Sequence, residues 1–333
     1  MYALRETSSL LNAPRRNISG ASGSKMSCAN EIEAGDVIVV AEARMLCCAS
    51  CAIPEVGDVK LKICDGCDLV RYCSDACQEY HRSEHEAKCK ERAAELRDEL
   101  LFKQPEGTHL GDCPLCCVPI PIGQDKSSTF SCCGKWICKG CAYADIARQW
   151  EENKQRTCPF CRHPLPKTDE ELTKNKMKRA ERNDPVALSQ MGELRHKERD
   201  YQSAFEYFTR AADLGDADSH YNLSIMYSKE QGVEKDEKKV IYHLEKASIA
   251  GCPQARHNLA CIEGKNCKFD RAVKHLIINA NLGFDLAIQE LKICYKYGLV
   301  SKDDFAAALR AHHAAVDAFK SPQREVAAAA NFR

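Results

Sequence analysis

Apolar and small residues recur along the second half of the chain at a spacing that predicts paired helices. Three segments align around a shared glycine: RAADLGDADSHYNL (210–223), KASIAGCPQARHNL (246–259) and INANLGFDLAIQEL (278–291). Gly215, Gly251 and Gly283 are 36 and 32 residues apart, and helix formers fill the intervals, as in 202–212 and 238–250. This period predicts a helical solenoid in which each glycine ends the second helix of a hairpin in the left-handed conformation.

A small residue precedes each of these glycines by three positions and would let the helices approach closely. These residues are Ala212, Ser248 and Ala280. The segment NDPVALSQM (183–191) supplies the opening half of an earlier copy. We expect 301–318 to form a capping helix, because Ser301 can cap its start and an apolar stripe follows. The stripe consists of Phe305, Leu309 and Val316.

The segment YSKEQGVEKDEKK (227–239) resembles the Sel1-like subclass of tetratricopeptide-type repeats. The resemblance implies an all-α helical-repeat solenoid with a concave surface for a peptide or protein. We expect no catalytic role for its histidines, because the sequence gives them no carboxylate or cysteine constellation; they are His220, His257 and His275. Its cysteines lack ligand spacing and are predicted to be buried thiols: Cys252, Cys261, Cys267 and Cys294.

Cysteine sets the first half of the chain apart. Of 22 cysteines among 333 residues, 17 lie within 47–161. No apolar segment typical of a secretory signal precedes them, so we expect an intracellular protein of cytoplasm or nucleus, where closely spaced cysteines favour metal binding over disulfides. Residues 1–45, with Cys28 and an alternative start at Met26, are predicted to be a disordered lead; a transit peptide is the other interpretation.

The first cysteine cluster contains four pairs of potential ligands. The pairs are Cys48-x2-Cys51, Cys64-x2-Cys67, Cys73-x3-Cys77 and His85-x3-Cys89. A two-residue gap forms a tight knuckle that directs both sulfurs to one ion, and a three-residue gap places two ligands on one face of a helix, here 74–90. Eight ligands suffice for two tetrahedral zinc ions. Cys47 is an alternative to Cys48, and His81 an alternative to His85.

This order resembles the MYND zinc finger, including the Tyr72-Cys73 pair and Gln78 after Cys77. The resemblance implies interleaved binding, with one zinc on Cys48, Cys51, Cys73 and Cys77 and the other on Cys64, Cys67, His85 and Cys89. Arg82 stands where the family usually carries tryptophan. In the family, that tryptophan ring forms part of a peptide-binding groove. Its absence weakens the expectation of such a groove here and leaves the implied metal sites unaffected.

The second cluster also consists of paired cysteines. The pairs are Cys113-x2-Cys116, the adjacent Cys132 and Cys133, Cys138-x2-Cys141, and Cys158-x2-Cys161, with Cys117 as a spare that we expect to be buried. The segments CPLC, CCGKWICKGC and CPFCR resemble a RING finger of the all-cysteine variant. The resemblance implies one zinc on Cys113, Cys116, Cys138 and Cys141, and a second on Cys132, Cys133, Cys158 and Cys161. The second set requires two adjacent cysteines to converge, and Lys135 at the usual histidine position cannot replace either. A site completed by other means is the alternative.

A RING finger implies a docking platform for a ubiquitin-conjugating enzyme rather than a nucleophile. The family's contact positions correspond to Leu115, Pro159 and Arg162. Arg162 would bridge ubiquitin and its carrier, since its five donors suit that role; the alternative is a solvated arginine. The family's contact tryptophan is absent at its usual spacing. Trp150 comes later, on a helix predicted over 143–152, and is a candidate core residue.

Charge and hydropathy narrow the function further. Lys+Arg and Asp+Glu both number 48, which removes the surplus positive charge that nucleic acid binding needs. No stretch approaches the roughly 18 apolar residues of a membrane span. Zinc ions with four protein ligands leave no position for catalytic water, which argues against metal-based hydrolysis. The helical second half lacks a glycine-rich cofactor motif, which argues against protein methylation.

The predicted fold is multidomain, with two small zinc-stabilised modules of short strands and helices followed by an all-α solenoid. The predicted organisation is a lead (1–45), a MYND finger (46–89), a linker helix and loop (90–112), a RING finger (113–163), a charged linker (164–184), Sel1-like repeats (185–300), a capping helix (301–320) and a tail (321–333). The linker contains KNKMKRAER (174–182), which is predicted to be a solvated charged helix; a nuclear-import or phosphate-binding patch is the other interpretation. We expect four zinc ions, two in each module. The leading hypothesis is a RING-type ubiquitin ligase whose repeats and MYND finger bind a client peptide; the alternative is a non-catalytic scaffold for protein complexes.

Overall fold

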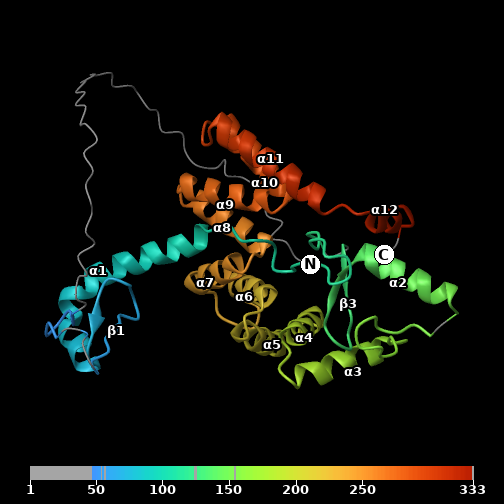
Figure 1. The fold of residues 1–333 in the computed structure, drawn as a ribbon, viewed down its shortest axis with the longest axis horizontal. Helices are drawn as coiled ribbons and strands as arrows, with labels where there is room; N and C mark the ends of the chain where they lie inside the picture. Colours follow the sequence, from blue (N-terminus) through green and yellow to red (C-terminus); the bar gives the residue numbers. More distant parts are fainter. Residues whose placement is uncertain (1–46, 54, 56–57, 124–125, 154, 332–333) are drawn as a thin grey trace. The chain divides into compact units, whose positions relative to one another are not determined.

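The computed structural model describes residues 47–53, 55, 58–123, 126–153 and 155–331, which form two compact units. The first unit ends at Leu100, the second begins at Leu101, and each is described separately. The predicted fold class is confirmed, since short-stranded cysteine-rich modules precede a region of helical hairpins (Figure 1). The predicted lead over 1–45 lies outside the described residues.

The first unit consists of a short hairpin and most of a long helix. Strand β1 (Lys62–Ile63) pairs antiparallel with β2 (Arg71–Tyr72). Helix α1 (Asp75–Phe102) joins the helix predicted over 74–90 to the predicted linker helix without a break. It does so because neither glycine nor proline interrupts the chain before Pro105.

Cysteines surround a single buried tyrosine in the core of this unit. Tyr72 is 1% exposed and lies opposite Lys62 in the hairpin. Among the residues that the structure describes, Leu61 is the one other buried apolar side chain of this core that is not a cysteine. Because so small a core buries little apolar surface, this module needs a further source of stability.

The second unit begins with another cysteine-rich module. Strand β3 (Ser127–Thr129) pairs antiparallel with β4 (Trp136–Cys138), with Ser128 opposite Ile137. Helix α2 (Lys139–Glu151) follows directly, four residues earlier than predicted. It starts there because the Sγ atom of Cys138 caps it by accepting a hydrogen bond from the Cys141 N–H.

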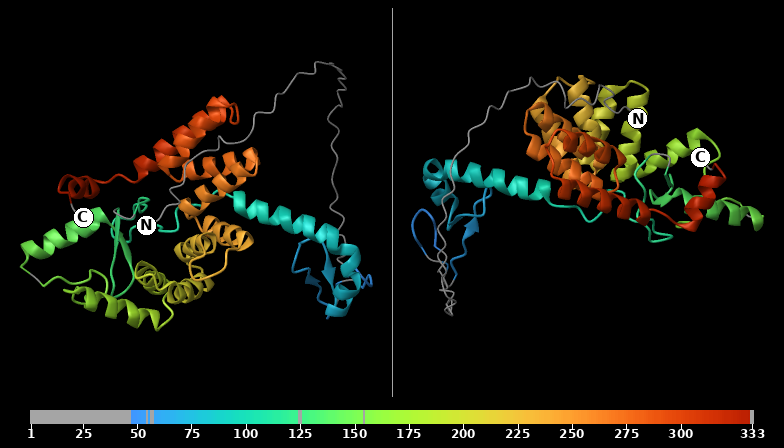
Figure 2. Two further views of the ribbon diagram at one scale, coloured as in Figure 1. Left: turned by 180° about the vertical axis from the view of Figure 1, so that it is seen from behind. Right: turned by 90° about the horizontal axis from the view of Figure 1, so that it is seen from above.

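The remaining helices form the repeat region. They are α3 (Asp169–Ala180), α4 (Pro185–Lys197), α5 (Tyr201–Asp213), α6 (Ala217–Lys229), α7 (Glu237–Ile249), α8 (Pro253–Lys265), α9 (Phe269–Asn281), α10 (Asp285–Lys296), α11 (Lys302–Ala318) and α12 (Pro322–Ala329). Helices α4 and α5, α6 and α7, and α8 and α9 pack as hairpins, and each hairpin contacts the next (Figures 1 and 2). The predicted helices over 202–212 and 238–250 are therefore confirmed to within one residue at each end.

The residues that begin and end these helices follow the predicted pattern. Aspartates cap α4, α5, α6 and α7 by accepting hydrogen bonds from backbone N–H groups. Gly215, Gly251 and Gly283 have φ angles of +88°, +88° and +80°, as the solenoid prediction requires. Ser301 caps α11, which packs against α9 and α10. A helix thus lies where the capping helix was predicted.

The glycine at 251 also meets a distant part of the chain. A Cβ atom at Gly251 would lie 2.7 Å from the Gly107 carbonyl oxygen, whereas a Cβ at Gly215 would meet nothing within 4 Å. We expect Gly215→Ala to cost about 1 kcal/mol for the left-handed backbone alone. Gly251→Ala should cost about 1–3 kcal/mol more, because a backbone segment must move. Urea unfolding of the two variants measures this difference, and equal costs would contradict the close packing of 107 against 251.

The predicted charged linker is a packed helix rather than a solvated one. Arg179 of α3 is 7% exposed. Its guanidinium donates to both carboxylate oxygens of Asp184, at 3.1 and 2.8 Å, and to the Ser131 carbonyl at 3.4 Å. The expectation of a solvated segment was wrong at Arg179, because its buried side chain connects the repeat region to the turn before β4.

The predicted tail likewise contains a packed helix, α12. A Cβ at Gly140 of α2 would lie 2.6 Å from the Arg324 backbone nitrogen, so only glycine fits beneath the start of α12. The Arg324 guanidinium donates to the carbonyls of Val118 at 3.0 Å and Pro119 at 2.8 Å. The tail assignment was wrong because Ser321 and Pro322 start a helix there.

Within the described ranges, no helix is both long and apolar enough to span a membrane.

Candidate metal centres

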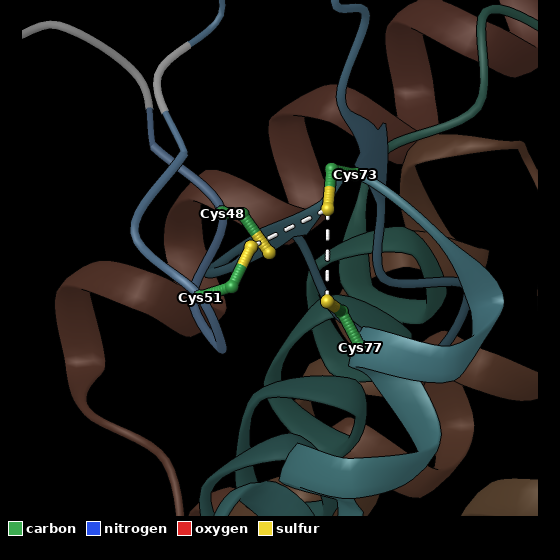
Figure 3. Close-up of side chains that lie close together, drawn as sticks. All are labelled: Cys48, Cys51, Cys73 and Cys77. Atoms are coloured by element: carbon green, nitrogen blue, oxygen red, sulfur yellow. Dashed lines mark hydrogen bonds between the residues drawn. The ribbon is translucent and has the colours of Figure 1, made fainter.

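Site 1 brings together ligands from the first knuckle, from the residue after β2 and from the first turn of α1. It consists of Cys48, Cys51, Cys73 and Cys77, whose sulfurs lie within 4.8 Å of one another (Figure 3). The Sγ atoms of Cys51 and Cys73 are 3.5 Å apart, and those of Cys73 and Cys77 are 3.6 Å apart. Cys48 is buried in this group, whereas Cys47 is exposed and outside it.

Site 2 is formed by the second knuckle and the next two turns of α1. It consists of Cys64, Cys67, His85 and Cys89. The Cys67 Sγ lies 3.2 Å from the His85 Nε2, and the Cys64 and Cys89 Sγ atoms are 3.7 Å apart. Burial lowers the pKa of His85, which keeps its ring neutral and able to bind a metal ion.

The alternative ligand His81 has a different partner. Its Nδ1 lies 3.0 Å from the Tyr72 hydroxyl, and its ring stacks on His85 with centroids 5.7 Å apart. It is half-buried. Tyr72 and His81 together support the face of α1 that carries His85.

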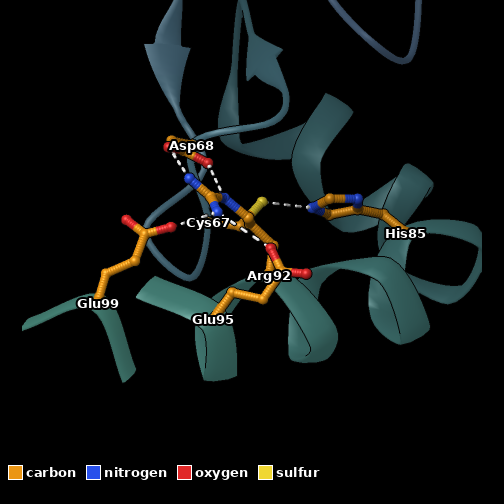
Figure 4. Close-up of polar contacts among 6 residues, drawn as sticks. All are labelled: Cys67, Asp68, His85, Arg92, Glu95 and Glu99. Atoms are coloured by element: carbon orange, nitrogen blue, oxygen red, sulfur yellow. Dashed lines mark hydrogen bonds and ion pairs between the residues drawn. The ribbon is translucent and has the colours of Figure 1, made fainter. Parts of the chain in front are cut away.

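An arginine that the sequence did not indicate holds α1 to the second knuckle. Arg92 donates to both carboxylate oxygens of Asp68, at 2.7 and 2.9 Å, and to Glu95 and Glu99 at 3.0 and 2.9 Å (Figure 4). Its hydrogen bonds to Asp68 lower the pKa of that carboxyl group. Asp68 follows Cys67 directly, so this contact fixes the position of a site 2 sulfur relative to α1.

Site 3 contains the complete set that the RING resemblance implied for the first zinc. It consists of Cys113, Cys116, Cys138 and Cys141. The Cys116 and Cys138 sulfurs are 3.9 Å apart, and the Cys138 N–H donates to the Cys113 sulfur at 3.4 Å. Burial opposes ionisation of Cys113, but backbone N–H groups of Cys138, Leu115 and Cys116 outweigh it and lower its pKa to about 7. Burial likewise opposes ionisation of Cys48, but backbone N–H groups of Cys51, Cys73 and Ser50 outweigh it and lower its pKa to about 6.

Site 4 shows how two adjacent cysteines can face one point. It consists of Cys132, Cys133, Cys158 and Cys161. The Sγ distances are 3.3 Å for Cys132 to Cys161 and 3.6 Å for Cys133 to Cys158. A turn makes this possible, because the N–H groups of Cys133 and Gly134 both donate to the Phe130 carbonyl and Gly134 has a φ angle of +71°. The structure therefore places all sixteen predicted ligands in the four groups that the sequence suggested.

These distances fit zinc better than disulfides. Two thiolates on one tetrahedral zinc lie about 3.8 Å apart, given Zn–S bonds of about 2.3 Å. Disulfide sulfurs lie about 2.05 Å apart, and every described cysteine is free of a disulfide. Each site offers four ligand atoms and leaves no position for water, so the arrangement suits structural zinc. The resemblance to the MYND finger and the clusters together support zinc binding.

The predicted contact residues of the second module lie on its surface. Leu115 is 44% exposed, Arg162 is exposed and Pro159 is half-buried. Trp150 is 72% exposed, so its assignment as a candidate core residue was wrong. Gln149 occupies the buried position instead, where its amide bonds the Thr157 backbone at 2.8 and 3.1 Å.

Some cysteines and one histidine outside the four sites differ from expectation. Cys117 and Cys267 are exposed rather than buried, and both have positive φ angles, of +54° and +60°. Cys252 and Cys294 are buried as expected, and Cys261 is half-buried. His257 has a carboxylate partner after all, since its Nε2 lies 3.0 Å from Glu290 Oε1.

Four ligand clusters followed by stacked helical hairpins define a class, the zinc-finger proteins with a helical-repeat region. Residues 48–89 match the MYND finger family, and residues 187–216 and 217–252 match the Sel1 repeat family. The chain therefore carries a MYND finger and Sel1 repeats, as the sequence suggested. Neither match extends over 113–161, so the RING assignment of that module has no support from them.

Relatives share short stretches of this chain. The Helicobacter pylori protein named "Putative beta-lactamase HcpC" is 40% identical over 52 residues in one strain, which is 16% of this chain and 18% of that protein. In a second strain it is 39% identical over 56 residues, or 17% of this chain and 19% of that protein. The chain thus matches less than a fifth of the length of these relatives.

Two solved structures of repeat proteins resemble the chain at low sequence identity. The Sel1 repeat protein from Oxalobacter formigenes is 24% identical with a TM-score of 0.41, over 54% of this chain and 73% of that one. The c5321 protective antigen of uropathogenic Escherichia coli, described as having an SLR fold, is 18% identical with a TM-score of 0.38, over 59% of this chain and 41% of that one.

Proposed function

We propose that this chain is a protein-interaction adaptor of the ubiquitin system, in which 113–163 act as a RING-type docking platform. One observation carries the proposal: sites 3 and 4 alternate along the chain, so that each knuckle pair of one site is separated by a pair of the other. Such interleaving is what the RING resemblance implied. MYND fingers and Sel1 repeats are protein-interaction modules, so the finger and the repeats supply surfaces for a client.

Zinc would be held at all four sites by the sixteen ligands named above. When bound, it supplies cross-links that replace the hydrophobic core these small modules lack. The ligands bring distant segments of backbone together and thereby hold the loops around Leu115 and Pro159 in fixed positions. The domain boundaries we propose are those of the sequence prediction, with α3 and α12 as parts of the second unit rather than as linker and tail.

The platform would work by orientation. Ubiquitin transfer occurs when a client amine attacks the thioester carbon of ubiquitin, the C–S bond breaks and the conjugating enzyme leaves as its thiol. No side chain of this module needs to form a covalent bond in that step. Leu115 would dock the conjugating enzyme, and Arg162 would restrict the motion of its linked ubiquitin, which raises the rate by limiting unproductive poses.

Exposed tyrosines on the helical hairpins support client binding by the repeats. Tyr242, Tyr295 and Tyr297 are 51%, 42% and 55% exposed. Tyrosine provides a large apolar ring with a polar tip at a low cost in side-chain entropy, and it is enriched where proteins bind each other.

A discharge assay tests the proposed activity. The purified chain is incubated with activating enzyme, a panel of conjugating enzymes, ubiquitin and ATP, and loss of the thioester is followed. We expect faster discharge with at least one carrier. The substitution Leu115→Ala should slow it by about tenfold, which corresponds to about 1.4 kcal/mol of docking energy.

The matched control is Leu69→Ala, because Leu69 is also an exposed leucine, at 55% against 44% for Leu115, and lies on the first unit. It should leave discharge unchanged. No discharge above background with any carrier would contradict the ligase proposal and favour the alternative, a non-catalytic scaffold whose zinc-built modules only dock proteins. Equal rates for Leu115→Ala and the parent chain would contradict the docking role of Leu115.

A further inference from the structure

A fifth group of potential metal ligands lies in the second unit, outside the four cysteine sites. It combines His109 from the segment between α1 and β3, Asp218 from the first turn of α6, and Cys252 from the residue before α8. Their ligand atoms lie within 4.8 Å of one another, and the His109 Nε2 is 3.0 Å from the Asp218 Oδ1. Three elements that are distant in sequence thus present nitrogen, oxygen and sulfur to one point.

The backbone fixes the orientation of the histidine. The main-chain N–H of His109 donates to the Gly251 carbonyl at 3.2 Å, and its Nδ1 lies 3.4 Å from the same oxygen. When Nδ1 carries the proton and donates it to this carbonyl, the lone pair of Nε2 faces Asp218 and Cys252. Histidines that bind metals in proteins use this arrangement, in which an outer hydrogen bond sets the tautomer.

The surroundings of the group suit a ligand set better than a catalytic pair. Both ring nitrogens of His109 lie near an oxygen, with Nδ1 3.4 Å from the Gly251 carbonyl and Nε2 3.0 Å from Asp218. Cys252 is 1% exposed, whereas the side chains of His109 and Asp218 are 12% and 38% exposed. A metal ion can therefore enter from the Asp218 side and reach a sulfur that bulky reactants cannot.

We propose that the His109 Nε2, an Asp218 carboxylate oxygen and the Cys252 Sγ bind a zinc ion that fastens the segment around 109 to the helical repeat. Mixed nitrogen, oxygen and sulfur ligands suit zinc, whereas calcium and magnesium take oxygen ligands almost alone. Ligand atoms on one tetrahedral zinc lie about 3.3–3.8 Å apart, which small side-chain rotations here would reach. The proposal is independent of the RING assignment and of ligase activity.

Metal content of the full chain tests this site. The protein is produced with ample zinc and dialysed against metal-free buffer, and zinc per chain is measured by mass spectrometry of the metal. We expect His109→Gln and Cys252→Ala each to contain one zinc fewer than the parent chain, with an unchanged helical signal in circular dichroism. Equal zinc in the parent and in both variants would overturn the proposal and leave His109 and Asp218 as an ion pair only.

Two further variants make the result specific. His312→Gln is the matched control, because the His312 Nε2 lies 3.1 Å from the Asp285 Oδ1 in the same kind of pair, and it should retain all zinc. Asp218→Asn preserves shape at an accessible position and keeps the test valid if loss of the buried thiol prevents folding. It should release zinc to a competing chelator at a concentration about tenfold lower. Retention equal to that of the parent chain would count against the site.

Discussion

Removal of zinc by a strong chelator is expected to unfold residues 48–161 while the helical repeat stays folded. The two cysteine-rich modules have small cores, and in the first one Tyr72 and Leu61 are the buried apolar side chains other than cysteine among the described residues. Structural zinc contributes about 10–16 kcal/mol to the folding of modules of this kind. The repeats instead bury whole rows of apolar side chains between adjacent helices. Their stability therefore does not depend on zinc at the four cysteine sites.

Hydrogen exchange with mass spectrometry measures this difference by segment. Peptides from 48–161 should lose protection on chelation and regain it when zinc is returned, while peptides from 185–300 keep theirs. A calcium-loaded chelator serves as the control for effects other than metal removal. Retained protection over 48–161 would contradict a structural role for zinc, and equal loss over both regions would contradict the independence of the repeats.

Arg256→Ala is expected to destabilise the second unit by about 3–5 kcal/mol. Arg256 is fully buried, and its Nη1 and Nη2 donate to the carbonyls of Leu101 and Ser248, each at 2.7 Å. Burial lowers the pKa of Arg256 to about 10, which still leaves it charged at neutral pH. Its removal would leave a cavity and two buried carbonyls without donors. The midpoint of urea unfolding, followed by circular dichroism at the helical band, measures the loss.

The control for Arg256 is another arginine of the repeats. Arg195 is paired with Glu198 at 2.7 Å, and a third of its side chain is exposed. Such a pair contributes little, so Arg195→Ala should change the free energy of unfolding by no more than about 0.5 kcal/mol. Similar costs for the two substitutions would show that the buried guanidinium is replaced by water without a penalty.

Local sequence patterns were sufficient to predict most of the fold. The glycine-centred period predicted the hairpins of the repeat region because a residue with positive φ is needed at each helix end, and Gly215, Gly251 and Gly283 have it. Paired cysteines predicted the four ligand groups because a knuckle is a local structure. Which pairs share an ion depends on long-range folding, and there the prediction came from family resemblance rather than from the residues alone.

Contacts between distant segments could not be predicted in this way. The approach of His109 to Asp218 and Cys252 joins residues more than 100 positions apart along the chain. Arginine is usually exposed, so the sequence does not indicate that Arg256 is buried. The start of α2 was missed because its cap is a cysteine, Cys138, rather than one of the usual capping residues.

The contact of Arg324 with the loop at 118 has a consequence for the order of events during synthesis. Arg324 and Val118 are 206 positions apart. At ribosomal speeds of about 5–20 residues per second, about 10–40 s pass between their additions to the chain. The second cysteine-rich module is therefore exposed for that time without its cover from α12. During that interval zinc can enter site 3 before the Arg324 guanidinium arrives beside the Cys116 sulfur, which lies 3.8 Å from it in the folded chain.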